Sequence, residues 1–191
     1  MSDLTEHDVQ KILRRQYMTN PEYVAENLYV FSWESDFLFK TRSGYWHEVE
    51  IKISFSDFKN DAKNKKEKFE ILETGELRSG CIKHKRPNYF SYCVTENMVD
   101  KVKPLLPAYA GLYYIDEKDN RLVNVKAHTK LHSEKIKDVS LNLTEKFYYN
   151  YREWKSACER WYDDRKELVA RIRFLESEYK AATGYDVRDI F

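Results

Sequence analysis

The stretch Trp33–Lys66, WESDFLFKTRSGYWHEVEIKISFSDFKNDAKNKK, decides the predicted fold of this chain. Two strand-like runs, Asp36–Thr41 and Tyr45–Ser54, flank a short turn at Arg42-Ser43-Gly44. Runs of this kind separated by a tight, glycine-containing turn are typical of a β-hairpin. The sequence therefore predicts two neighbouring antiparallel strands, and the second is expected to be central in the sheet.

The second run alternates between apolar and charged residues, and successive side chains of a strand point to opposite faces. The face predicted to meet the core carries Val49, Ile51 and Ile53. The other face carries Glu48, Glu50 and Lys52. Carboxylates and an ammonium on a central strand are costly unless they pair or serve a function. The hairpin also brings Asp36 near this charged row.

Composition limits what the chain can be. Its 191 residues suggest one domain with an appendage, or two small ones. The net charge of +1 gives no overall basic field, so any nucleic-acid contact must come from local patches. Three cysteines without metal-like spacing, a polar N-terminal stretch and the lack of a long apolar run predict a cytoplasmic protein without a signal peptide or membrane span.

The remaining pattern predicts the other elements of a core in residues 1–126. They are, in order, a helix from Thr5 to about Asn20, a strand at Leu28–Trp33, the hairpin, a helix capped by Ser56 and running to about Glu70, a loop over 73–87, a strand at Tyr89–Val94, a short helix after Thr95, a strand at Ala110–Ile115 and an edge strand at Leu122–Val125. Strand, helix and strand in succession favour a parallel pair. The fold class is therefore α+β, with a mixed central sheet and flanking helices.

Residues 127–191 are predicted to form a helical C-terminal extension. The pattern is helical from about Leu141 to Ala182, and Gly184 is a natural stop. Two series of residues spaced by seven run along this helix: Trp154, Trp161, Leu168 and Leu175, and Cys158, Arg165, Ile172 and Tyr179. This spacing is typical of a coiled-coil seam. The seam either packs on the chain's own body or forms a homodimer or partner interface.

Asp36, Glu50 and Lys52 form the set of residues that can carry chemistry. Mg²⁺ prefers oxygen ligands, usually one or two carboxylates with waters. A bound metal ion can activate water for phosphodiester hydrolysis, and a nearby lysine can neutralise the developing charge. The carbonyl of Ile51 and the carboxylate of Glu6, on the first helix, are candidates for further ligands.

These residues carry a resemblance to a known family. Asp36, thirteen intervening residues and then Glu50-Ile51-Lys52 resemble the motif of the PD-(D/E)XK nuclease superfamily. The predicted order of helix, three-stranded meander, helix and strand is also similar to its restriction-endonuclease-like αβββαβ core. The resemblance covers about residues 5–116 and is strongest to small DNA-repair-associated and phage-encoded members.

The resemblance implies a Mg²⁺- or Mn²⁺-dependent deoxyribonuclease. By position, Asp36 and Glu50 would be metal ligands and Lys52 the catalytic lysine, while Glu6 matches an acid on the first helix of many members. The chain departs from the pattern at Ser35, where the motif has a proline. The alternative is a weak or inactive nuclease-fold module that binds nucleic acid or a protein partner.

Two basic patches are candidates for contacting DNA, and both have a simpler interpretation as solvated surface. They consist of Lys59, Lys63 and Lys66 on the helix after the hairpin, and of Lys83, Lys85 and Arg86 in the following loop. The charged face of the hairpin could likewise be a solvated sheet face. Glu48 is expected to be an acid at the surface or behind the ligands, and Glu6 could simply complement the helix dipole.

Overall fold

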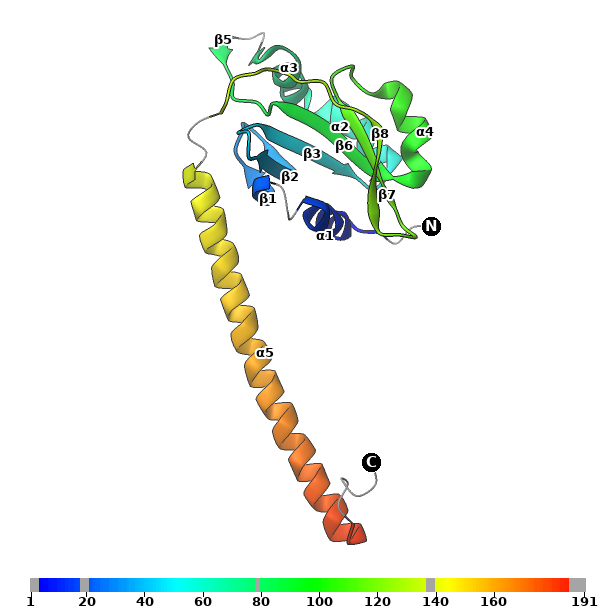
Figure 1. The fold of residues 1–191 in the computed structure, drawn as a ribbon, viewed down its shortest axis with the longest axis vertical. Coiled ribbons are helices and arrows are strands. Elements are labelled where there is room, and N and C mark those ends of the chain that lie inside the picture. Colours follow the sequence, from blue (N-terminus) through cyan, green and yellow to red (C-terminus); the bar gives the residue numbers. More distant parts are fainter. Residues whose placement is uncertain (1–3, 18–20, 78–79, 137–139, 186–191) are drawn as a thin grey trace. The chain divides into compact units, whose positions relative to one another are not determined.

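The computed structural model describes residues 4–17, 21–77, 80–136 and 140–185, and its fold is α+β (Figure 1). The chain divides into two compact units, Met1–Leu143 and Thr144–Phe191. The first unit holds a mixed sheet with helices on both faces, and the second is a single long helix. None of the described helices is long and apolar enough to cross a membrane.

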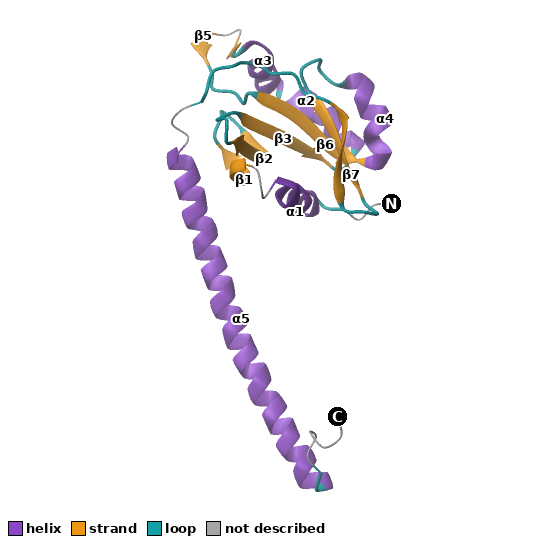
Figure 2. Cartoon of the chain, in the orientation of Figure 1, coloured by secondary structure: helices purple, strands orange, loops and turns teal. Residues whose placement is uncertain are grey.

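The main sheet has six strands in the order β1-β2-β3-β6-β7-β8 (Figure 2). Their bounds are β1 Pro21–Tyr29, β2 Glu34–Thr41, β3 Trp46–Lys52, β6 Tyr89–Thr95, β7 Gly111–Asp116 and β8 Arg121–Lys126. β1, β2 and β3 form an antiparallel meander, β6 pairs parallel with β3, and β7 pairs parallel with β6. The predicted hairpin is therefore β2–β3, and β3 is an interior strand as expected.

Helices and one small hairpin surround this sheet. They are α1 Glu6–Tyr17, α2 Phe55–Asn64, α3 Lys66–Thr74, the small hairpin β4 Glu76–Leu77 and β5 Gly80–Lys83, and α4 Val99–Val102 with the 3₁₀ turns η1 Glu96–Met98 and η2 Lys103–Leu105. The remaining helix, α5 Ser140–Thr183, makes up most of the second unit. Thr5 caps α1 as predicted: the Asp8 N–H donates to Thr5 Oγ1 at 3.2 Å, and the Thr5 N–H donates to Asp8 Oδ2 at 3.2 Å.

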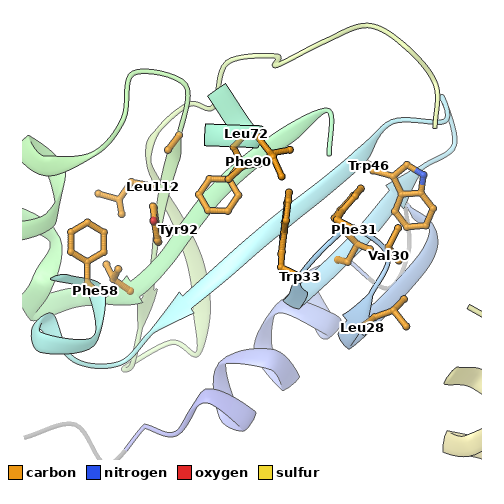
Figure 3. Packing of buried hydrophobic residues seen from close by; sticks show 14 of the residues in the cluster. Leu28, Val30, Phe31, Trp33, Trp46, Phe58, Leu72, Phe90, Tyr92 and Leu112 are labelled. Carbon is orange, nitrogen blue, oxygen red and sulfur yellow. The ribbon is translucent and has the colours of Figure 1, made fainter. Parts of the chain in front are cut away.

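Two apolar cores lie on the two faces of the sheet. On one face, Val9 and Leu13 of α1 pack with Val49 and Ile51 of β3. The other core joins α2, α3 and α4 to the sheet (Figure 3), and its members include Trp33, Phe58, Leu72, Phe90 and Tyr92. Because helices cover both faces, the charged row of β3 is enclosed rather than solvated.

Several sequence-based boundaries were wrong. Ser54, and not Ser56, caps α2, and its hydroxyl accepts from the Asp57 N–H at 3.2 Å. β1 is Pro21–Tyr29 instead of Leu28–Trp33, because residues 30–33 bend and their aromatic side chains enter the core. Ile53 is 44% exposed, because β3 ends at Lys52. The single helix expected over 56–70 is two helices with a break at Lys65, which ends α2 and begins α3.

The segment after β8 belongs to the first unit, beyond the predicted boundary at residue 126. The Thr129 N–H donates to the Tyr109 carbonyl at 3.0 Å, and the Leu131 N–H donates to the Asn88 carbonyl at 2.8 Å. The buried Asn88 amide also donates to the carbonyls of His132 and Glu134 at 3.0 and 2.8 Å. These long-range bonds leave no signal in local sequence, so the boundary at Leu143 could not be read from composition.

Candidate active site

Glu50 of β3 is fully buried, and three ammonium groups surround its carboxylate. Lys52 Nζ, two residues along the same strand, lies 2.9 Å from Oε1, and Lys65 Nζ lies 2.5 Å from the same oxygen. Lys68 Nζ contacts Oε2. A buried carboxylate is tolerated only when it is paired in this way.

The break between α2 and α3 positions two of these lysines. Lys65 stands at the break and Lys68 in the first turn of α3, so both reach down to β3. Lys68 Nζ also lies 2.7 Å from Glu48 Oε1, and the Trp33 indole N–H donates to both Glu48 oxygens at 2.9 and 3.1 Å. Glu48 was expected either at the surface or behind the ligands, and Lys68 belongs to a lysine run typical of a solvated helix face. They are buried because the helices close over this face of the sheet.

Asp61 of α2 is the third buried acid beside these lysines. Its Oδ1 lies 3.4 Å from Lys52 Nζ and 3.0 Å from Lys65 Nζ. Its Oδ2 is buried and has no hydrogen-bond partner among the described residues. We call the three acids and three lysines the charge cluster: Glu48, Glu50, Asp61, Lys52, Lys65 and Lys68. In their ionised forms the six charges balance.

Asp36 lies at the edge of the charge cluster. The β2–β3 register pairs Phe37 with Val49, and one more residue along the hairpin brings Asp36 beside Glu50. Asp36 Oδ2 accepts a hydrogen bond from the Ile51 N–H at 2.8 Å. Gln10 of α1, itself buried, donates to the Asp36 carbonyl at 3.0 Å and so ties the first helix to this strand.

The charges of the cluster separate the pKa values of the two motif acids. Burial and the negative charge of Glu50 raise the pKa of Asp36 to about 7. Burial alone would raise the pKa of Glu50, but the three ammonium groups hold it well below its ordinary value. Burial alone would lower the pKa of Lys52, but Glu50 raises it. At neutral pH, Glu50 and Lys52 are therefore charged, and Asp36 is the acid that exchanges a proton.

The motif acids fit a hard cation in part. In a strand, the N–H and C=O of one residue point to the same side, so the Ile51 carbonyl faces Asp36 as its N–H does. Asp36, Glu50 and this carbonyl are oxygen donors of the kind that a Mg²⁺-type ion prefers, while ammonium groups hold both oxygens of Glu50. Glu6 is exposed at the start of α1, and within the described residues no group of three or more His, Cys, Asp or Glu side chains could hold a metal ion.

The residues expected to contact DNA fall into different environments. Lys59, Lys63 and Lys66 are exposed on α2 and α3. A pocket of about 520 Å³ lined by Lys63, Lys65, Lys66 and Lys68 borders the charge cluster. A second pocket, of about 460 Å³, is lined by Arg86 and His132 rather than by cluster residues.

Arg86 is half-buried, and its guanidinium supports the end of α3. Its Nη1 donates to the carbonyls of Ile71 and Leu72, the latter at 2.6 Å, near the end of α3. Gly75 ends this helix with a φ of 84°, a conformation that favours glycine, and the Arg86 guanidinium lies against it. Lys85 is exposed, while the side chain of Lys83 lies outside the described part of the chain.

The members of the site that come from α1, α2 and α3 were not predicted from the sequence. Gln10 reaches β2, and Asp61, Lys65 and Lys68 reach β3, only after the helices dock. The lysines stand in a run, KNKKEK, that is typical of a solvated helix face. One feature of the sequence pointed to them. Two acids on a central strand need cations to pair with, and Lys52 alone cannot neutralise both.

Comparisons with known proteins give a likeness of fold. No family model and no curated protein matches the chain. A solved structure of a protein of unknown function from Silicibacter pomeroyi is similar, with a TM-score of 0.55 and 17% sequence identity. The match covers 82% of this chain and 93% of that one. At this identity the similarity extends to the fold alone.

Proposed function

We propose that this protein is a nuclease of the PD-(D/E)XK type, with a restriction-endonuclease-like core, that hydrolyses phosphodiester bonds in DNA with Mg²⁺ or Mn²⁺. One observation carries the proposal. The β2–β3 hairpin holds Asp36 beside Glu50, and Lys52 lies 2.9 Å from Glu50. In metal-assisted phosphodiester hydrolysis, neighbouring acids hold the metal ion and a protonated lysine stabilises the developing negative charge.

The order of the elements also supports the proposal. α1 precedes the antiparallel meander β1–β3, helices follow, and β6 returns parallel to β3. This is the αβββαβ order that the motif's family would have. Because sheet folds host many activities, the order supports the architecture, and the side chains must support the chemistry.

Each motif residue has a role in this scheme. A bound metal ion would polarise the scissile phosphate and lower the pKa of the attacking water. Asp36, Glu50 and the Ile51 carbonyl would hold it. Lys52 stays protonated, so it acts as a charge that stabilises the developing phosphorane and not as a base. The exposed lysines of α2 and α3 would bind the DNA backbone in a salt-dependent way.

Lys52→Met is expected to slow DNA cleavage by at least about 100-fold, since it removes the ammonium that faces the reacting phosphate. The variant should fold, because the buried Glu50 carboxylate remains paired with Lys65 and Lys68. The measurement is the Mg²⁺-dependent cleavage rate of single- and double-stranded DNA. Lys101→Met, on the exposed side of α4, is the matched control and should cleave at the normal rate. If cleavage is unchanged in both Lys52→Met and Asp36→Asn, these residues are not the active site.

Metal binding is expected to compete with Lys65. The Lys65 side chain is 37% exposed and can pair with Asp61 alone, whereas the Lys68 side chain is 3% exposed and is also held by Glu48. Lys65→Met should therefore tighten Mn²⁺ binding by about 10-fold, because a hydrogen bond between charged groups contributes about that much free energy. Calorimetric titration at pH 8 measures this affinity. Lys66→Met, one residue along the chain and exposed, should leave it unchanged, and equal affinities in all three proteins would contradict the competition.

A second candidate is a module on the same scaffold that binds nucleic acid or a protein without cleaving. The observation in its favour is that ammonium groups hold both oxygens of Glu50. The two candidates differ in their response to metal. Thermal stabilisation by Mn²⁺ together with cleavage supports the nuclease. DNA binding that persists with no thermal shift in Mn²⁺ supports the module.

A further inference from the structure

One side of α5 carries a long, mostly apolar seam that nothing else in its own unit covers. Every described residue from 150 to 185 is exposed. The seam residues alternate at spacings of four and three: Phe147, Tyr151, Trp154, Cys158, Trp161, Arg165, Leu168, Ile172, Leu175, Tyr179 and Ala182. An exposed apolar stripe of this length on a charged helix marks an interaction surface.

We propose that the α5 helices of two copies of this chain form a parallel, in-register, two-stranded coiled coil. Alternating spacings of four and three are the a and d positions of a heptad repeat, here unbroken from residue 147 to residue 182. Tyr151, Cys158, Arg165, Ile172 and Tyr179 take position a, and the other seam residues take position d. This inference is independent of the proposed nuclease activity.

The seam's chemistry favours two strands. Ile172 at position a lies between Leu168 and Leu175 at position d, and a β-branched residue at a with leucine at d favours a parallel dimer. Arg165 is the one charged residue in the seam. A single polar residue at position a fixes register and strand number at some cost in stability.

Charge complementarity favours the parallel direction. In a parallel pair, position g of one helix faces position e of the next heptad of its partner, which places Arg171 opposite Glu176. Asp164, at position g, then lies next to Arg165 of the other copy. The other g–e pairs from 150 to 183 contain no like charges. In an antiparallel pair aligned over the same seam, the two Asp164 carboxylates would face each other and repel.

The seam is large enough for a stable interface. Tyr151, Trp154, Trp161 and Tyr179 are 40–64% exposed. Aromatic side chains bury about 150–250 Å² each when fully enclosed, so eight half-exposed ones in a pair supply roughly 600–1,000 Å². With the leucines and isoleucines added, the pair reaches the size of a specific interface, about 1,000 Å² or more.

The first test is the mass of the intact protein in solution by light scattering. The full chain should have twice the mass of one copy. Leu168→Glu/Leu175→Glu, which places two charges in the seam, should halve that mass. Ala170→Glu/Ser177→Glu adds the same charges at the same spacing on the opposite side of α5 and should remain dimeric. A monomeric native chain, as expected if the seam packs on the chain's own first unit, would overturn the proposal. So would a dimer that both double variants leave intact.

The second test reads direction and register from Cys158. In the proposed pair the two Cys158 thiols face each other at one a layer. With oxidised glutathione they should form one intermolecular disulfide, while the glutathione disulfide is reduced to two thiols. Cys158→Ser should abolish the covalent dimer on a non-reducing gel, and Cys81→Ser should not. In an antiparallel pair Cys158 would face Leu168, so a dimer that does not cross-link through Cys158 would overturn the parallel arrangement.

Discussion

Lys68→Met is expected to lower the free energy of unfolding by about 3–5 kcal/mol, the usual cost of removing one partner of a buried ion pair. The Lys68 ammonium lies 2.7 Å from Glu48 and also contacts Glu50, and both carboxylates are fully buried. Methionine fills a similar volume, so the loss would reflect the uncompensated carboxylates rather than a cavity. Chemical denaturation at pH 7 measures it.

Two further variants separate the ion pair from general effects of the helix. Lys66→Met changes an exposed residue of α3 in the same way and should alter stability by no more than about 0.5 kcal/mol. Glu48→Gln combined with Lys68→Met should recover part of the lost stability, because it removes one of the stranded carboxylates. Equal stabilities of Lys66→Met and Lys68→Met would show that the buried pairing contributes nothing.

Asp36→Asn is expected to stabilise the metal-free protein at pH 8 by about 2–4 kcal/mol, and the gain should vanish near pH 4. Asp36 has a pKa of about 7 in the folded chain because it is buried beside Glu50, compared with an ordinary value of about 3.9. Below pH 4 the carboxyl is protonated in both states. Between pH 4 and 7 the unfolded chain gives up this proton while the folded chain retains it. Wild-type stability therefore falls as the pH rises, and asparagine removes that loss.

The comparison needs the same measurement at pH 4, 6 and 8 without metal. Asparagine can still accept the Ile51 N–H through its amide oxygen, so the hydrogen bond at 2.8 Å is kept. Asp100→Asn, an exposed change on α4, serves as the control and should lie within about 0.5 kcal/mol of wild type at each pH. A gain that is the same at all three pH values would refute the titration of Asp36 as its cause.

Together these variants distinguish groups that stabilise the fold from groups that the fold tolerates. Lys68 stabilises buried acids, whereas Asp36 is held against a neighbouring negative charge at a cost. Functional sites commonly keep such unfavourable arrangements because activity requires them. A divalent cation between Asp36 and Glu50 would turn this repulsion into attraction, so Asp36→Asn should be more stable than wild type without metal and less responsive to it.

The local pattern of the sequence was sufficient for the hairpin, the faces of β3 and the long helix. Strand alternation put Glu50 and Lys52 on one face, and the short turn brought Asp36 beside them. The heptad seam and Gly184 fixed the extent of α5, which runs from Ser140 to Thr183. These features depend on residues close in the chain, where the periodicity of a helix or strand acts directly.

Tertiary structure alone decided the environment of the charges. In the sequence, Lys68 belongs to a run of lysines that is typical of an exposed helix face. In the structure, the break at Lys65 points its ammonium group at Glu50 of β3. Arg86 stands in a basic loop that the sequence assigns either to solvent or to DNA, and the structure adds its hydrogen bonds to carbonyls at the end of α3. Whether a charged side chain is solvated or buried depends on which helices close over it. The docking of these helices is driven by the burial of apolar side chains in both cores. Those side chains come from distant parts of the chain, so a local sequence pattern does not predict it.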